Sequence, residues 1–523
     1  MANSRSVSML FISQKVKDIK VSPNGPLEQE IGILRRGLRR HAFIPGDKVP
    51  ADLAPQRIDD EGVFYADIPG GQLSSDLDTS IHVRFPLNLK DTNVNLDIET
   101  VFSSAEGTRV DDGGNVQNMI INTVLAITNG GIRERLRENG GDISIAIASS
   151  SDPFRQTPTI ADDLGESCEV FELDIPDRFA IQLPWEEGGA SGTLAITSEP
   201  RETKYAVEDL IREKPDFARV LEGATCIISS DPVFDVLERH ATPPYSYIIN
   251  SSTAFRSLVA AEAYNRSVIL PMNQNEAADV CRLLLQRKYS QELDAIQRPP
   301  FPSPLKPRGD EVDESSLEEL DRSLDMFRTF IPLYRHYERM AICSPITFGP
   351  EGGLVVGTGT EEIACFTSTP APENEKHLLE SFGDSSKIEW DRKYEVGAGD
   401  AAATIISIFD AIDPILFIGP FLEGRESEDR LLLELASTVY VSLLSRVAGS
   451  FLVRNQLTNW SNIQPDAFES LFDQVARESL EVSREMVRRV PSGPVLRPVE
   501  KWGIQVLIWR VGKIAYPERE RGI

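Results

Sequence analysis

A glycine-rich turn in this sequence runs into an apolar, helix-like segment and carries an acid at the junction. Residues 394–414 read YEVGAGDAAATIISIFDAIDP, in which Asp400 directly follows the Gly-Ala-Gly of 397–399. Such a turn exposes backbone N–H groups that have no partner inside the helix, and the helix dipole adds partial positive charge there. The turn therefore suits a phosphate group, and Asp400 could accept a proton from a hydroxyl nucleophile. The alternative is that Asp400 only caps the helix and the glycines only form the turn.

A second motif, GGNVQN at 113–118, places two glycines before a helix-like segment and two amides in its first turn. Gly113 and Gly114 permit a tight backbone approach. Asn115 and Asn118 carry amides that both donate and accept hydrogen bonds, which suits a polyhydroxylated ligand such as a sugar. An asparagine that caps a helix after a glycine turn is an equally good explanation of this motif alone.

A third motif follows the strand-like SVILP of 267–271. Asn273 and Glu276 stand three residues apart, on one face if a helix has begun. At the carboxyl edge of a parallel sheet, an amide and a carboxylate can hold the water shell of Mg²⁺. The alternative is a capping arrangement in which Glu276 stabilises a helix N-terminus.

A fourth motif lies in PITFGPEGGLVVG. Thr347 and Gly349 end one strand-like segment, and Gly352 opens the next. The threonine hydroxyl and the glycine backbone could contact the phosphates or ribose of a nucleotide. A plain hairpin turn that contains Pro350 explains the same residues.

The segments that would position these motifs alternate between strand and helix. SVSMLFI near the start is typical of a buried strand, and from about residue 117 onward helix-like and strand-like segments follow one another. This alternation predicts an α/β protein with a mainly parallel sheet wrapped by helices. Residues 19–112 instead contain strand-like runs and loops, which predicts a β-rich excursion away from that sheet.

Composition excludes several classes of protein. The chain has 523 residues and a net charge of −27, which disfavours non-specific nucleic-acid or anionic-membrane binding, because both need surface cations. Its five cysteines are scattered and favour neither a disulfide framework nor a zinc site. The start lacks a signal-peptide pattern, and no uninterrupted apolar run approaches the ~20 residues of a membrane helix. We therefore expect a cytoplasmic protein with no nucleic-acid or membrane partner.

The order of the four motifs, GGNxxN, NxxE, TxGxxG and GAGD, resembles that of the ribokinase-like (PfkB-type) carbohydrate kinases. The resemblance covers roughly residues 110–450, and only the motifs are specific. It implies a ribokinase-like three-layer αβα sandwich with a mainly parallel sheet and a β-rich lid. It also implies Mg²⁺-dependent transfer of a terminal phosphoryl group from ATP or ADP to a hydroxyl of a sugar or sugar-like substrate. Lids of this family often pair between subunits, so the resemblance is compatible with a homodimer.

The resemblance also implies a role for each matching residue. Asp400 matches the catalytic base. The remaining matches are the anion hole (Gly397, Ala398, Gly399), the nucleotide side (Thr347, Gly349, Gly352), the substrate side (Gly113, Gly114, Asn118, with Asn115 beside them) and the Mg²⁺ region (Asn273, Glu276).

The chain departs from the family pattern in two respects. The family usually has a strand followed by G-x-x-x-x-D, whose aspartate binds sugar hydroxyls; SQKVKD supplies Asp18 after a good strand, whereas GQLSSD supplies Asp76 after a poorer one. We favour Asp18. The usual Asp-Thr before GAGD is replaced by YEV, which is more similar to the ADP-dependent sugar kinases, as is the length of the chain. GGNxxN and TxGxxG, in contrast, are more similar to the ATP-using branch, so the donor is open between ATP and ADP.

The expected organisation is a first core strand in 1–18, a β-rich lid with insertions in 19–112, an α/β core in 113–460 and a C-terminal extension in 461–523. A Pro-rich insertion at 298–316 interrupts the core. Two alternatives remain open. One is a non-catalytic ribokinase-like protein that binds a ligand or has a regulatory role. The other is an unrelated doubly wound α/β protein whose glycine turns are structural.

Overall fold

The structure of the protein is a computed structural model. The structure describes residues 6–21, 65–67, 80–85, 108–155, 158, 160, 164–175, 177–187, 190–198, 203–231, 233–242, 245–249, 267–269, 271–273, 346–347, 352–357, 363–368, 398–454, 460, 465–490, 495–499 and 502–510.

A six-stranded, all-parallel sheet forms the centre of the fold, and we call it the main sheet. Its strand order is β12-β11-β10-β1-β6-β7. The strands are β1 (Val7–Ser13), β6 (Ile143–Ser149), β7 (Cys168–Glu172), β10 (Cys226–Ser229), β11 (Ser246–Ile249) and β12 (Ser267–Ile269). Because the strands are parallel, their carboxyl ends meet at one edge of the sheet, where the loops that carry function in open α/β folds are found.

Both faces of the main sheet are covered. Along β1, Met9 and Phe11 pack into one hydrophobic cluster, whereas Leu10 and Ile12 pack into another. Successive side chains of a strand point to opposite faces, so both faces of this strand are buried. This explains why SVSMLFI is apolar almost without alternation.

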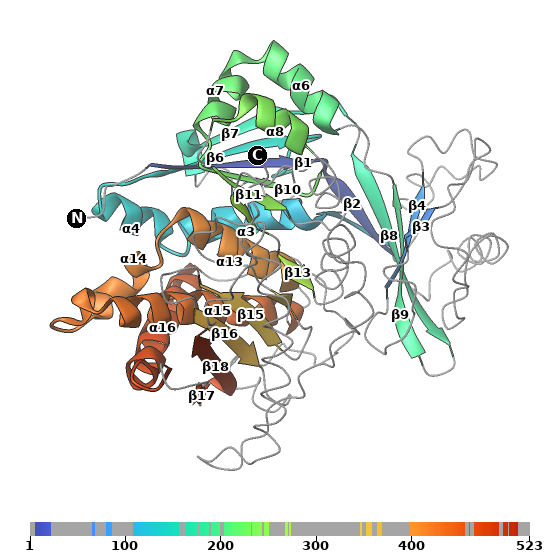
Figure 1. Cartoon of the computed structure of the whole chain (residues 1–523). Helices are drawn as coiled ribbons and strands as arrows, with labels where there is room; N and C mark the ends of the chain where they lie inside the picture. The colour runs from blue at the N-terminus through green and yellow to red at the C-terminus, as the bar shows by residue number, and fades with distance from the viewer. Residues whose placement is uncertain are drawn as a thin grey trace, which may run out of the picture.

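Helices form the two outer layers, on opposite sides of the main sheet in Figure 1. One layer contains α6 (Thr203–Glu213), α7 (Pro215–Gly223) and α8 (Phe234–His240). The other contains α3 (Asn115–Thr128), α4 (Ile132–Glu138), α13 (Ala398–Ala411), α14 (Ile415–Ile418), α15 (Arg430–Arg454) and α16 (Pro465–Met486). The predicted α/β class, with a parallel sheet between helices, is confirmed.

A second sheet is mostly antiparallel and packs against α15. Its order is β13-β14-β15-β16-β18-β17, and only β13 and β14 are parallel. Its strands are β13 (Met272–Asn273), β14 (Ile346–Thr347), β15 (Gly352–Val356), β16 (Ile363–Ser368), β17 (Val495–Val499) and β18 (Ile504–Arg510).

A third sheet stands apart from the helical layers in Figure 1, and we call it the lid sheet. Its order is β3-β4-β9-β8-β2-β5. The strands are β2 (Val16–Val21), β3 (Tyr65–Asp67), β4 (Ser80–Phe85), β5 (Thr108–Gly113), β8 (Arg178–Glu187) and β9 (Ala190–Ser198). The predicted separate β-rich unit is therefore present, and β2 enters it two residues after β1 ends.

The strand pairing differs from the expected domain boundaries at three places. β2 begins at Val16, inside the segment expected to hold only the first core strand. β8 and β9 were expected in the core but pair with lid strands, because local alternation predicts a strand without predicting its sheet. In the expected C-terminal extension, β18 pairs with β16 and α16 packs on α15, so this segment completes the core. The Pro-rich segment 298–316 lies outside the described residues.

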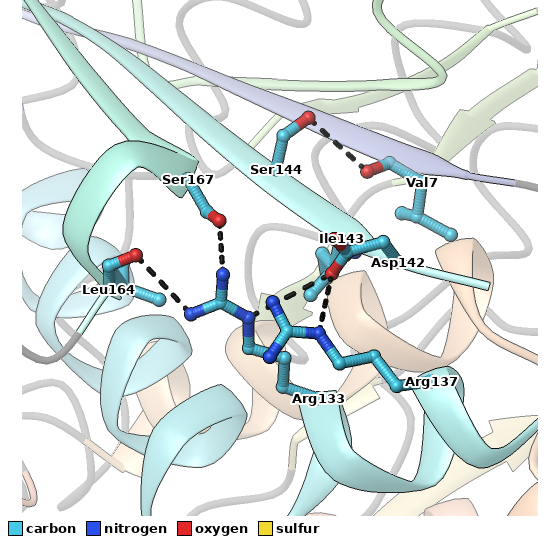
Figure 2. Close-up of polar contacts among 8 residues, drawn as sticks. All are labelled: Val7, Arg133, Arg137, Asp142, Ile143, Ser144, Leu164 and Ser167. Atoms are coloured by element: carbon cyan, nitrogen blue, oxygen red, sulfur yellow. Dashed lines mark hydrogen bonds and ion pairs between the residues drawn. The ribbon is translucent and has the colours of Figure 1, made fainter. Parts of the chain in front are cut away.

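A cluster of polar contacts braces the amino end of β6, as Figure 2 shows. Arg133 donates hydrogen bonds to Leu164 O and to Ser167 Oγ. Asp142, one residue before β6, forms ion pairs with Arg133 (Nε to Oδ1, 3.8 Å) and with Arg137 (3.5 Å). These contacts join α4 to the edge of the main sheet at which its strands begin, and their role is structural.

One described helix is long and apolar enough to span a membrane by length and composition, namely α15 over Arg430–Gly449. The segments Gly399–Ala411 and Ile415–Phe421 pass the same test only as a pair, with a bend of 88° between them. The sequence predicted no uninterrupted apolar run of this length, and the longest candidate was instead 401–422, broken by Asp410, Asp413 and Pro414. α15 packs against α13, α16 and β16 and is mostly buried, which explains its composition as that of a core helix.

Candidate active site

The first turns of α3 and α13 meet through a hydrogen bond between two predicted site residues. Asn118 Nδ2 donates to Asp400 Oδ2 over 2.9 Å, and the two residues are 282 positions apart in the chain. Asn118 is 4% exposed and Asp400 is 9% exposed. The substrate-side motif and the proposed catalytic acid therefore lie in direct contact.

The start of α3 depends on the glycine at its N-cap. Gly114 has φ of +97°, a conformation that residues with a side chain rarely adopt. A Cβ at this position would lie 2.8 Å from Val16 Cγ2 of the lid sheet. Glycine thus allows α3 to begin directly against β2.

The side chains of the GGNVQN motif do not provide the cap that the alternative explanation required. The N-cap is Gly114, with no side-chain capping hydrogen bond. Asn115 is exposed, whereas Asn118 is buried and directed to Asp400. The capping explanation therefore does not account for Asn118.

One polar atom of Asn118 is left for another partner. Its Oδ1 is buried and has no hydrogen-bond partner among the described residues. A buried acceptor without a partner costs free energy unless a ligand or water satisfies it. Next to Asp400, this atom is placed to accept a hydrogen bond from a hydroxyl.

The N-terminus of α13 has the form of an anion site. The helix begins at Ala398, and Asp400 lies in its first turn. Gly399 is exposed, and a Cβ built there would have no atom of the described residues within 4 Å. The first N–H groups of a helix have no partner inside the helix, so the residue types present at this helix start fit a phosphoryl group.

The backbone registers place Asp18 near the start of α3. Asp18 lies on β2 opposite Asp111 of β5 and Ala180 of β8. Two residues earlier, Val16 pairs with Gly113. The competing candidate, Asp76, lies outside the described residues.

The nucleotide-side and Mg²⁺ residues are only partly described. Asn273 of β13 pairs with Thr347 of β14, which in turn pairs with Gly353 of β15. The backbones of the two motifs therefore lie side by side on adjacent strands. At Gly352 a Cβ would lie 2.4 Å from Thr367 O, so strand packing alone explains this glycine. Gly349, Glu276 and Gly397 lie outside the described residues.

Sequence reasoning missed a polar cluster at the carboxyl edge of the main sheet. Its buried members are Gln14, Lys15, Ser149, Ser150 and Asp231. A signal was available: the same four residues, Ser-Ser-Asp-Pro, occur directly after β6, at 150–153, and from the last residue of β10, at 229–232. Polar residues repeated after two strands of one sheet indicate a shared role at its edge.

No family model and no curated protein sequence matches this chain. Three solved structures are similar over most of its length. Ribokinase from Thermotoga maritima shares 11% identity, covering 92% of this chain and 99% of its own, with a TM-score of 0.32. A 2-dehydro-3-deoxygluconokinase from the same organism shares 9% identity over 89% and 99%, with a TM-score of 0.36. A putative 2-keto-3-deoxygluconate kinase from Enterococcus faecalis shares 10% identity over 94% and 99%, with a TM-score of 0.29. At such identities and TM-scores, these similarities carry no argument about the site.

Proposed function

We propose that this protein is a ribokinase-like kinase that transfers the terminal phosphoryl group of ATP or ADP to a hydroxyl of a sugar or sugar-like substrate, with Mg²⁺. The observation that carries this proposal is the hydrogen bond between Asn118 and Asp400. It joins a residue suited to a polyol with a residue suited to accept a proton, at a helix start suited to a phosphoryl group.

In the proposed reaction, the acceptor hydroxyl lies beside Asp400 and donates a hydrogen bond to its carboxylate. As its oxygen forms a bond to the terminal phosphorus, the bond from that phosphorus to the leaving nucleotide breaks, and the hydroxyl proton passes to Asp400. The hydrogen bond from Asn118 Nδ2 holds the carboxylate in position. The backbone N–H groups at the start of α13 face the charge of the transferring group, as in an oxyanion hole.

The Mg²⁺ and nucleotide parts of the proposal rest on fewer residues. A bound Mg²⁺ would neutralise phosphate charge, and it usually keeps several waters. Asn273 and Glu276 are proposed to lie toward it, and Thr347 toward the nucleotide; the pairing of Asn273 with Thr347 supports a common location. Gly349 and Gly352 stay on the nucleotide side of the proposal, although packing is sufficient to explain Gly352.

The lid sheet would exclude water from the site. An open site would hydrolyse the nucleotide instead of phosphorylating the acceptor, so kinases of small molecules commonly close over their substrates. β2, which carries Asp18, connects to β1 by two residues and contacts Gly114. The proposed substrate acid therefore lies on the element that would close.

The test is a screen of the purified full chain with Mg²⁺, using ATP and ADP as donors and hexoses, pentoses, nucleosides and other polyols as acceptors. The proposal predicts acceptor-dependent nucleotide consumption and a phosphorylated product for one class. Binding of a sugar or nucleotide by calorimetry, with no transfer from either donor, would identify a non-catalytic ligand-binding protein instead. Neither binding nor transfer would reject the ribokinase-like proposal altogether.

A further inference from the structure

The connection from the main sheet to the lid sheet passes between two identical sequence segments. β1 lies between β10 and β6 in the main sheet. Ser-Ser-Asp-Pro occurs at the end of both neighbours: at 229–232 it begins with the last residue of β10, and at 150–153 it directly follows β6. The chain leaves β1 through Gln14 and Lys15 and enters β2 at Val16.

Each residue of this connection is held by one of the two segments. Gln14 N donates to Asp231 Oδ2 over 3.1 Å, and Lys15 N donates to Ser150 Oγ over 2.9 Å. All four residues are more than nine-tenths buried. The backbone between the two sheets is therefore fixed from both sides in a place that water does not reach.

Ser150 also holds a second lid strand. Its Oγ donates to Asp177 Oδ1 over 2.7 Å, while Ser151 Oγ donates to Asp177 Oδ2 over 3.0 Å. Asp177 directly precedes β8, whose first residue, Arg178, pairs with Val16. A hydroxyl can accept and donate at once, so Ser150 joins the starts of two adjacent lid strands.

The residues after Ser150 are tied to the helix that carries Asn118. Lys15 Nζ donates to Asp152 O over 2.7 Å, and Gln117 Nε2 donates to Pro153 O over 2.5 Å. Gln117 is the neighbour of Asn118 in the first turn of α3. The loop 150–153 therefore forms hydrogen bonds both with the residue before β2, the strand of Asp18, and with α3, the helix of Asn118.

We propose that Ser150 is a positioning residue that sets where the lid strand β2, and with it Asp18, lies relative to Asn118 and Asp400. It acts through Lys15 and Asp177 and does not contact substrate. In its application to substrate binding, this inference rests on the kinase function proposed above.

The first test needs no substrate and uses hydrogen–deuterium exchange of the full chain. Ser150→Ala leaves the Lys15 N–H and one Asp177 oxygen without their partner, so the amides of Val16–Val21 and Arg178–Glu187 should exchange about tenfold faster. Ser150→Thr keeps a hydroxyl and should restore slow exchange. Ser151→Ala, the matched control, should affect the start of β8 but not β2. Unchanged exchange in β2, or an equal rise throughout the main sheet, would overturn the proposal.

The second test measures turnover with the acceptor that the screen identifies. Ser150→Ala should raise the acceptor KM by about tenfold and increase nucleotide hydrolysis relative to transfer, with a smaller change in kcat. Asp177→Ala, which breaks the same connection from a less buried residue, should act in the same direction. An acceptor KM equal to that of the wild type in both variants would refute the positioning role. If the wild type transfers to no acceptor, the kinase proposal fails, and exchange alone then decides whether Ser150 holds β2.

Discussion

The two polar atoms of the Asn118 side chain have different surroundings. Nδ2 donates to Asp400, whereas Oδ1 is buried without a partner among the described residues. One turn further along α3, Asn122 is fully buried, and its Oδ1 accepts a hydrogen bond from Trp460 N over 2.9 Å. Asn122 Nδ2 is also buried without a partner among the described residues, so the contact with Asp400 is what distinguishes Asn118 as the asparagine suited to a ligand.

Substitution of these two asparagines should separate activity from stability. Asn118→Ala should lower turnover by about tenfold or more and raise the acceptor KM, since it removes a group that orients both the base and the hydroxyl. Asn122→Ala should leave kcat unchanged but lower the free energy of unfolding by about 1–3 kcal/mol, because Trp460 N loses its partner. Steady-state kinetics and thermal denaturation measure both effects. Loss of stability without loss of activity in Asn118→Ala would contradict the assignment.

Two glycines with free space around them provide a second contrast. A Cβ at Gly399 or at Gly419 would have no atom within 4 Å in the part of the chain that the structure describes, and only Gly399 lies at the proposed phosphoryl position. Gly399→Ala should keep or slightly raise stability, because alanine favours helix, yet it should lower transfer by about tenfold or more by occupying that space. Gly419→Ala, also at a right-handed helical position, should likewise keep or slightly raise stability but should leave transfer unchanged. Equal transfer rates in both variants would argue against an anion site at the start of α13.

At the scale of the element, α13 carries chemistry at one end and a buried carboxyl near the other. Burial raises the pKa of Asp410 above its ordinary value of 3.8, and the Ser246 hydroxyl opposes this shift. Neither carboxyl oxygen has a well-formed hydrogen bond among the described residues. Burial, with a smaller contribution from Asp410, likewise raises the pKa of the Cys226 thiol. The charged form of Asp410 therefore lowers the free energy of unfolding.

The cost of Asp410 should depend on pH in a defined direction. Because its pKa is higher in the folded state, the folded state binds more protons, and stability falls as pH rises from the ordinary value through the raised one. Asp410→Asn should raise the free energy of unfolding by about 1 kcal/mol at pH 7, with a smaller gain near pH 4. Urea denaturation at both pH values measures this, with the exposed Glu428→Gln as control. A gain that does not shrink at low pH would contradict the explanation.

Individual strands and helices could be predicted from the sequence, but their pairing could not. The strand in SVSMLFI and the helix after GAGD follow from local apolar patterns, and both are present in the structure. The assignment of β8 and β9 to the lid sheet could not be predicted, because it depends on the pairing of β8 with β2, about 160 positions away. The repeated Ser-Ser-Asp-Pro was visible in the sequence, but its meaning depends on β10 and β6 both flanking β1.

At the scale of the whole molecule, the fold brings distant segments to one place. Strand β1 of the main sheet leads through two residues into β2 of the lid sheet. The chain leaves the lid sheet at the end of β5, and α3 begins two residues later. The motif order predicted that the segments near 118 and 400 would converge, and the hydrogen bond between their side chains agrees with that prediction. The nucleotide side stays a prediction, since Gly349, Glu276 and Gly397 lie outside the described residues.

The most direct test of the account is phosphoryl transfer by Asp400→Asn. Asparagine retains an oxygen that can accept from Asn118 Nδ2 but cannot take the hydroxyl proton, so the fold should persist while turnover falls by at least about a hundredfold. Single-turnover transfer from the donor and to the acceptor found in the screen, with a melting temperature measured on the same sample, gives both quantities. An unchanged melting temperature with this loss of turnover is the predicted result. Turnover equal to that of the wild type would remove Asp400, and the site built around it, from the mechanism.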